Sequence, residues 1–158
     1  MRHCLVLATV LLIFTSVLPT ACARQPLPAA PGAQGMGLTE FVDSLRKAGA
    51  TVEVIGDSRR PEPTFSVTGK DITINTEHAE VFEFSNEATA ETEANFVSPD
   101  GWKVTRRLAD NRTTILDFNW IAPPHWYKSG RIILIYAGEN QSIMSLLESL
   151  LGKQFAGR

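Results

Sequence analysis

The sequence predicts an α+β domain in which an antiparallel or mixed sheet of about six to seven strands has three helices packed on it. Three observations lead to this fold class. Apolar residues repeat at helical spacing in 38–48 and 143–151, short alternating segments between them indicate strands, and tight turns join neighbouring strands.

The first predicted helix has one apolar face, which comprises Leu38, Phe41, Val42, Leu45 and Ala48. Gly49 follows at the position where a glycine commonly ends a helix. Residues 51–56 then alternate β-branched side chains, which indicates a strand. The prolines and arginines of 57–63 indicate a loop.

A hairpin is predicted next, because residues 68–71 (Thr-Gly-Lys-Asp) suit a two-residue turn with glycine at its first central position. In that register Val67 faces Ile72, and Phe65 faces Ile74. All four side chains would then share one buried face, since strand side chains alternate between the two faces of a sheet.

Residues 80–85 carry Phe82 and Phe84 on one face and indicate a further strand. Asn86 is a suitable N-cap for a following helix, whose thin apolar stripe of small side chains would lie close to a sheet. The turn-forming residues 98–101 (Ser-Pro-Asp-Gly) would end this helix.

A second hairpin is predicted within residues 102–120. The expected register pairs Trp102 with Trp120 and Val104 with Phe118. This register leaves a charged side chain on the apolar face, where an arginine would stand opposite a leucine.

Residues 131–136 contain an unbroken apolar run of strand length, which indicates a central strand covered on both faces. Asn140 is a suitable N-cap for the last helix, and Gly152 would end it. The apolar stripe of this helix comprises Ile143, Leu146, Leu147, Leu150 and Leu151. We expect the helix to cover the sheet.

The composition is that of an ordinary globular protein. The 158 residues include 15 lysines and arginines against 17 acids, and 44% are hydrophobic, so a disordered chain or a disulfide scaffold is excluded. A formal net charge of -2 gives no electrostatic reason to expect nucleic acid as a partner.

The first residues predict an extracytoplasmic destination. A short positive start and an apolar run over 4–18 have the order of a secretory signal peptide, predicted as 1–21. A hydrophobic anchor retained in the mature protein is the alternative. Residues 22–37 are rich in Pro, Gly, Ala and Gln and predict a flexible tether, followed by one domain over 38–158.

Two cleavage sites compete. Residues 21–23 (Ala-Cys-Ala) fit cleavage before Arg24, whereas 18–22 resemble a bacterial lipobox in which Cys22 is acylated. Cys4 and Cys22 are the only cysteines, so Cys22 has no disulfide partner in the mature chain. We therefore expect lipidation of Cys22 and a membrane-anchored lipoprotein, with a secreted or soluble periplasmic protein as the alternative.

The sequence contains no catalytic, cofactor-binding or metal-binding motif, so we expect no cofactor. The histidines of the mature chain, His78 and His125, are too few and too distant to predict a zinc site. Residues 71–100 contain eight acids and no lysine or arginine. This run predicts either a cation-attracting face or an ordinary solvated surface, and its spacing is too wide for a calcium loop.

An unusual stretch, Pro123-Pro124-His125-Trp126-Tyr127, predicts a rigid loop that displays aromatic side chains. One interpretation is a surface for a partner or ligand, because Trp and Tyr are favoured interface anchors. The alternative is a lid that folds its aromatic side chains onto the core.

The second half of the chain resembles a set of small uncharacterised bacterial cell-envelope proteins of lipoprotein type. The residues that carry the resemblance are 81–84, 98–101, Trp120, 122–127, 129–136, 146–152 and 154–157. The resemblance covers 81–157 and implies an extracytoplasmic setting, with no activity attached.

These observations predict a non-enzymatic binding or structural module of the cell envelope. Its expected partners are the membrane, through the lipid on Cys22, and an envelope protein or small ligand. The alternative is a small hydrolase-like envelope enzyme with a dispersed site around His125, which would need a cleft beside His125 and a carboxylate to orient the ring.

Overall fold

The computed structural model describes residues 35–60, 64–107 and 112–157 of the chain. The predicted signal segment, Cys22 and most of the tether lie outside these residues, as do parts of the loops expected near 57–63 and 110–112. No helix among the described residues is long and apolar enough to span a membrane.

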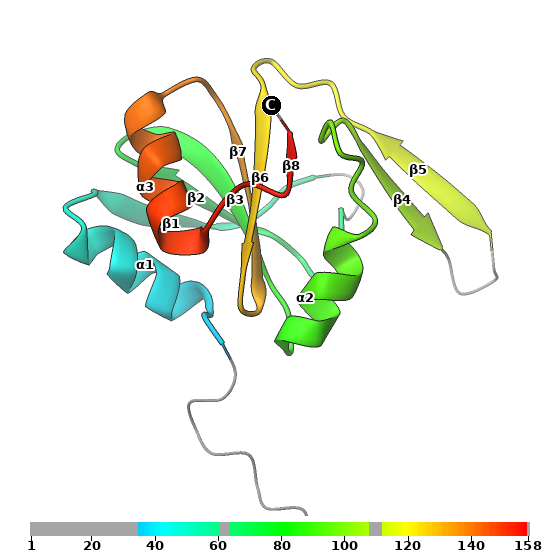
Figure 1. Ribbon diagram of the computed structural model, residues 1–158, viewed down its shortest axis with the longest axis horizontal. Helices are drawn as coiled ribbons and strands as arrows, with labels where there is room; N and C mark the ends of the chain where they lie inside the picture. Colours follow the sequence, from blue (N-terminus) through cyan, green and yellow to red (C-terminus); the bar gives the residue numbers. More distant parts are fainter. Residues whose placement is uncertain (1–34, 61–63, 108–111, 158) are drawn as a thin grey trace, which may run out of the picture.

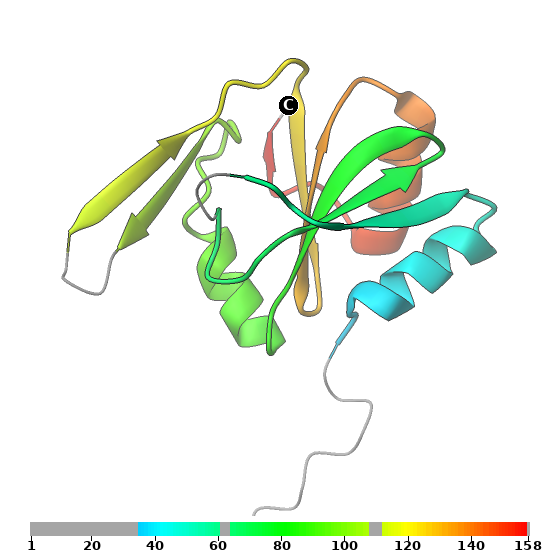
Figure 2. The ribbon, with the colours of Figure 1, turned by 180° about the vertical axis from the view of Figure 1, so that it is seen from behind.

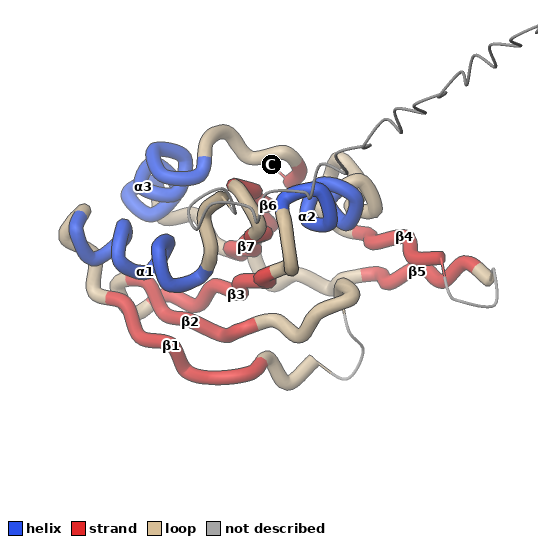
Figure 3. Tube along the Cα trace, turned by 90° about the horizontal axis from the view of Figure 1, so that it is seen from below, coloured by secondary structure: helices blue, strands red, loops and turns tan. Residues whose placement is uncertain are grey.

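The described residues form three helices and eight strands, which confirms the predicted α+β class. Six strands make one antiparallel sheet in the order β1-β2-β3-β7-β6-β8, most of which can be followed in Figure 3. Their bounds are β1 Val52–Asp57, β2 Lys70–Ile74, β3 Glu77–Glu83, β6 Pro124–Ser129, β7 Ile132–Ala137 and β8 Ala156–Gly157. A second, two-stranded sheet pairs β4 (Lys103–Arg107) with β5 (Thr113–Asp117) and projects from the body (Figures 1 and 2).

The helices divide between the two faces of the main sheet. α1 (Leu38–Lys47) and α3 (Gln141–Leu151) share one hydrophobic core with the sheet, and α2 (Glu87–Ala94) belongs to a second core on the other face. Figure 1 shows α1 and α3 on one side of β6 and β7, with α2 on the other side.

The central strand β7 confirms the prediction of a strand covered on both faces. Its residues Ile132 and Leu134 lie in the core beneath α1 and α3, while Ile133 and Ile135 lie in the core beneath α2. All four are at most 3% exposed. Burial of each of these side chains stabilises the fold by about 1.5–3 kcal/mol. β7 therefore contributes to the stability of both hydrophobic cores.

The predicted end of α1 and the predicted starts of α2 and α3 are confirmed, because they depend on local hydrogen bonds. α2 itself ends at Ala94, before the turn 98–101 that was expected to end it. Gly49 has φ of 90° and follows α1, where its N–H donates to the carbonyl of Arg46 at 3.0 Å. The side chain of Asn86 accepts a hydrogen bond from the N–H of Thr89 at 2.9 Å and caps α2. Asn140 caps α3 in the same way, through the N–H groups of Ser142 and Ile143.

The hairpin predicted over 65–74 is wrong. β2 pairs with β1 and β3 instead, and Phe65 lies in the core opposite to the one that buries Ile72 and Ile74. The tight turn is at Asn75 and Thr76, where both residues have positive φ and join β2 to β3.

Gly69 suggested the wrong turn, but its role in the structure is to allow close packing against side chains of β3. A Cβ on Gly69 would lie 2.5 Å from Oε1 of Glu80 and 2.8 Å from Cε1 of Phe82. The glycine therefore allows the loop before β2 to approach the β3 side chains.

The second predicted hairpin is confirmed, but its register differs from the prediction by two residues. Val104 lies opposite Leu116, and Arg106 lies opposite Thr114, so no leucine faces the arginine. A shift of two preserves the face of each side chain. Phe118 and Trp120 lie beyond the end of β5 and pack against the aromatic core.

Candidate functional site

The segment predicted as a partner or ligand surface comprises Pro123, Pro124, His125, Trp126 and Tyr127, and most of it forms β6 between β7 and β8. His125, Trp126 and Tyr127 are 2%, 0% and 2% exposed. The predicted loop is therefore wrong, and the aromatic side chains pack as the lid interpretation required, although from a strand. Pro124 fits because it is the first residue of the strand, where proline is tolerated.

The contacts of the His125 ring are with other parts of the core and serve the structure of the fold. Its Nε2 lies 3.0 Å from the carbonyl oxygen of Gly138, its Nδ1 lies 2.7 Å from the side-chain amide of Gln154, and its ring stacks on Tyr136. Neither hydrogen-bond partner is a carboxylate. The geometry that a hydrolase-like site around His125 would need is therefore missing within the described chain.

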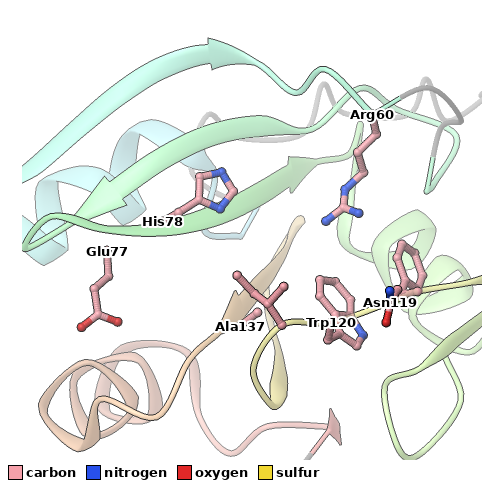
Figure 4. A pocket seen from close by; sticks show the side chains of 8 residues that line it. Arg60, Glu77, His78, Asn119, Trp120 and Ala137 are labelled. Carbon is pink, nitrogen blue, oxygen red and sulfur yellow. The ribbon is translucent and has the colours of Figure 1, made fainter.

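An open cleft of about 420 Å³ lies instead at the end of the sheet where β3 begins and β7 ends (Figure 4). We call it the Arg60 cleft. Its walls are Arg60, Glu77, His78, Phe118, Asn119, Trp120, Ile121 and Ala137. Four separate parts of the chain supply them: the loop after β1, the start of β3, the connection from β5 to β6, and the end of β7.

The guanidinium group of Arg60 lies between an acid and two aromatic rings. Its Nε is 2.6 Å from Oε2 of Glu80, and its Cζ lies 5.2 Å from the ring centre of Phe118 and 5.4 Å from that of Trp120. The side chain of Glu80 is only 3% exposed, while that of Arg60 is 30% exposed. Loss of Arg60 would leave a buried carboxylate without its counter-ion, which costs several kcal/mol.

Phe118 and Trp120 form the aromatic wall of the cleft, and a turn at Gly101 fixes its position. Phe118 and Trp120 stack with ring centres 4.9 Å apart, and the indole N–H of Trp120 donates to the carbonyl of Gly101 at 2.9 Å. The indole of the buried Trp126 donates to the same carbonyl at 3.1 Å. Gly101 has φ of 75° and ends the predicted turn 98–101, which is confirmed by the hydrogen bond from its N–H to Ser98 at 2.8 Å.

A hydrogen-bonded acid forms the opposite end of the cleft. Glu77 accepts hydrogen bonds from the hydroxyl of Tyr136 and from Nδ2 of Asn140, the latter at 2.6 Å. These bonds lower the pKa of Glu77. Burial, together with the hydrogen bond to Glu77, raises the pKa of Tyr136 to about 12. The contacts tie the start of β3 to the end of β7 and to the N-terminus of α3.

Acids outnumber bases around the cleft. Glu77 and Glu80 come from the acidic run 71–100, and Asp71 lies 3.1 Å from Nε2 of His78. Arg60 is the single lysine or arginine among the lining residues that the structure describes. The other acids of the run serve elsewhere: Glu83 and Glu91 form ion pairs with Arg131 and Lys128, and Glu93 accepts the N–H of Ser66.

The sequence did not predict Arg60, Phe118 or Trp120 as site residues. The acids of the cleft belong to the run 71–100, for which a cation-attracting face was one of two interpretations. Arg60 stood in a proline-containing loop, and Phe118 and Trp120 were assigned to a hairpin. Their only local signal is the pair of aromatic residues two positions apart. Long-range packing brings this pair to Arg60 and Glu80.

The described residues contain no group of three or more His, Cys, Asp or Glu side chains arranged to hold a metal ion. No protein family, curated protein or solved structure matches the chain. The resemblance of residues 81–157 to bacterial cell-envelope proteins therefore stays a prediction.

Proposed function

We propose that the protein is a lipid-anchored, extracytoplasmic binding module whose ligand site is the Arg60 cleft. The observation that carries this proposal is the cleft itself, with a stacked aromatic wall, a cation and hydrogen-bonding groups converging on about 420 Å³. Ligand sites typically combine apolar walls with a few fixed polar groups.

Binding is favoured over catalysis by the side chains that line the cleft. Among the residues that the structure describes, they include no serine, threonine or cysteine that could act as a nucleophile beside His78. The exposed groups are suited to contact instead, since Ile121 is fully exposed and Asn119 is exposed beside Trp120. Aromatic rings and amides of this kind are common in binding surfaces.

The point where the tether would enter the domain supports a cleft that faces away from the membrane. Gly35 and Met36 pack on the turn between β6 and β7, where the N–H of Arg131 donates to the carbonyl of Met36 at 3.0 Å. The Arg60 cleft lies beyond Ala137 at the other end of β7, roughly 20 Å away for a six-residue strand. Figure 1 shows these two ends at opposite poles of β7.

An acylated Cys22 would therefore hold the turn between β6 and β7 toward the membrane and leave the cleft facing away from it. The thirteen residue steps from Cys22 to Gly35 span at most about 45 Å when fully extended, which would set the reach of the domain from the bilayer.

The anchor is tested by intact-mass analysis of the mature protein from membrane fractions. We expect a chain that begins at Cys22 and carries acyl chains, and we expect Cys22→Ser to release the protein from the membrane. A chain that begins at Arg24 without lipid would contradict the anchor.

The binding site is tested on the mature chain carrying Cys22→Ser, with ¹⁵N-labelled tryptophan side chains. The probes are a panel of blocked amino acids, short peptides, saccharides, nucleotides and polyamines. We expect at least one class to shift the indole signal of Trp120, which lines the cleft, more than that of Trp102, which does not. Absence of any response at Trp120 across the panel would contradict the proposed site.

A further inference from the structure

The position of the Arg60 guanidinium has the chemistry of a receptor for cations. Glu80 on β3 supplies a carboxylate, and Phe118 and Trp120 supply two aromatic rings within about 5.5 Å of the guanidinium carbon. These groups come from segments far from Arg60 in the sequence. The cation receptor is therefore formed by Glu80, Phe118 and Trp120, and the guanidinium group of Arg60 occupies it.

Charge around this position favours a cation. Glu80 is almost fully buried and has Arg60 as its one described ion-pair partner, while Glu77 and Asp71 add negative charge around the cleft. A planar guanidinium suits the position better than an ammonium group, because it stacks on rings while donating hydrogen bonds in its plane. A neutral or anionic group would leave Glu80 without compensation.

Arg60 lines two cavities. One is the Arg60 cleft, and the other is a cavity of about 110 Å³ lined by Arg60, Thr64, Gly69, Glu80 and Phe82, among others. The hydroxyl of Thr64 is buried and has no hydrogen-bond partner among the residues that the structure describes. Arg60 and this unused hydroxyl therefore line the same small cavity.

The occupant belongs to a loop, so its withdrawal requires no change in the sheet. Arg60 lies between β1 and β2, outside any helix or strand, and the N–H of Ser58 closes the base of this loop on the carbonyl of Gly69 at 2.8 Å. The described contacts of the Arg60 side chain are those to Glu80, Phe118 and Trp120.

We propose that the Arg60 cleft recognises a guanidinium group, and that the side chain of Arg60 occupies the receptor until an incoming arginine replaces it on Glu80, Phe118 and Trp120. This inference rests on the proposed function, because it names the ligand chemistry of the same cleft. Self-occupation lowers the apparent affinity by the fraction of time that the receptor is open. The guanidinium can belong to free arginine or to an arginine residue of a peptide.

The test is calorimetric titration of the mature chain carrying Cys22→Ser with N-acetyl-arginine methylamide. Arg60→Gln empties the receptor but keeps a hydrogen-bonding side chain, and we expect it to bind this probe at least about tenfold more tightly than the parent protein. Glu80→Gln should abolish binding. Arg59→Gln is the matched control, since Arg59 is exposed and does not line the cleft, and it should bind as the parent does.

Matched probes separate charge from shape. N-acetyl-citrulline methylamide has nearly the same shape without the charge, and we expect it to bind at least about tenfold more weakly than the arginine probe. Comparison of free arginine with the blocked probe identifies the source. Tighter binding of the blocked form indicates a peptide arginine, and equal or tighter binding of free arginine indicates the amino acid.

Equal affinity of Arg60→Gln and the parent protein, or equal affinity for arginine and citrulline probes, would overturn this inference. If Arg60→Gln fails to fold alone, the inference predicts that millimolar arginine probe restores its circular dichroism, and failure to do so would also overturn it. Responses of Trp120 to other probe classes but not to guanidinium would overturn the inference and leave the proposed function standing. No response to any class would remove both.

Discussion

Truncation of Trp126 tests whether the aromatic stretch of β6 is part of the core. Trp126 is fully buried, its ring lies within 6.1 Å of those of Phe65, Phe118 and Trp120, and its indole N–H is bonded to Gly101. Trp126→Ala removes a large buried ring and leaves a cavity, which costs about 3–5 kcal/mol of unfolding free energy. In a domain of this size the loss lowers Tm by about 10 °C or more.

The assay is thermal unfolding followed by circular dichroism, with Trp102→Ala as the matched control. Trp102 is 38% exposed and lies outside both hydrophobic cores, so its truncation should change the unfolding free energy by less than about 1 kcal/mol. A Tm for Trp126→Ala within about one degree of the parent, or equal losses in both variants, would refute the assignment of Trp126 to the core.

Four further predictions follow from the contacts described above. Ile133→Asp should prevent folding, seen as loss of cooperative melting, because both faces of β7 are covered. Gly69→Ala should lower Tm, because its Cβ would meet Glu80. Glu77→Gln should flatten the loss of stability in acid, because the lowered pKa of Glu77 gives stability above its usual pKa of 4.5 that is lost as the pH falls. Stability should also decline between pH 10 and 12, where Tyr136 keeps its proton only in the folded state; Tyr136→Phe should remove this step in alkaline melts.

Elements with local signals were predictable from the sequence. Gly49, Asn86 and Asn140 mark helix ends through hydrogen bonds within a few residues, and all three act as expected. The apolar run of β7 likewise indicated a strand covered on both faces, because no polar residue interrupts it.

Two elements were predicted wrongly, because the local sequence pattern of each is typical of a different structure. Gly69 and its flanking apolar residues suggested a hairpin, although the glycine is required for contact with β3 and the real turn uses Asn75 and Thr76. The stretch 123–127 suggested a loop because of its prolines. It is a strand because pairing with β7 on one side and β8 on the other buries its aromatic residues.

The candidate site could not be predicted because its parts meet only through tertiary packing. Arg60 and Glu80 are twenty residues apart, and Trp120 is forty residues further along the chain. No spacing rule links a loop arginine to a strand acid and an aromatic pair. Pairing of β3 with β7, together with the turn at Gly101 that holds Trp120, is what brings them together.

The Nε–H signal of Arg60 in ¹⁵N NMR spectra tests the central claim most directly, because it reports the hydrogen bond to Glu80 itself. In the free protein this signal should differ from that of the exposed Arg59. The account predicts that saturation with N-acetyl-arginine methylamide moves the Arg60 signal to the position of a solvent-exposed arginine, while the probe gains contacts to Trp120. A bound probe that leaves the Arg60 signal unchanged would contradict the account.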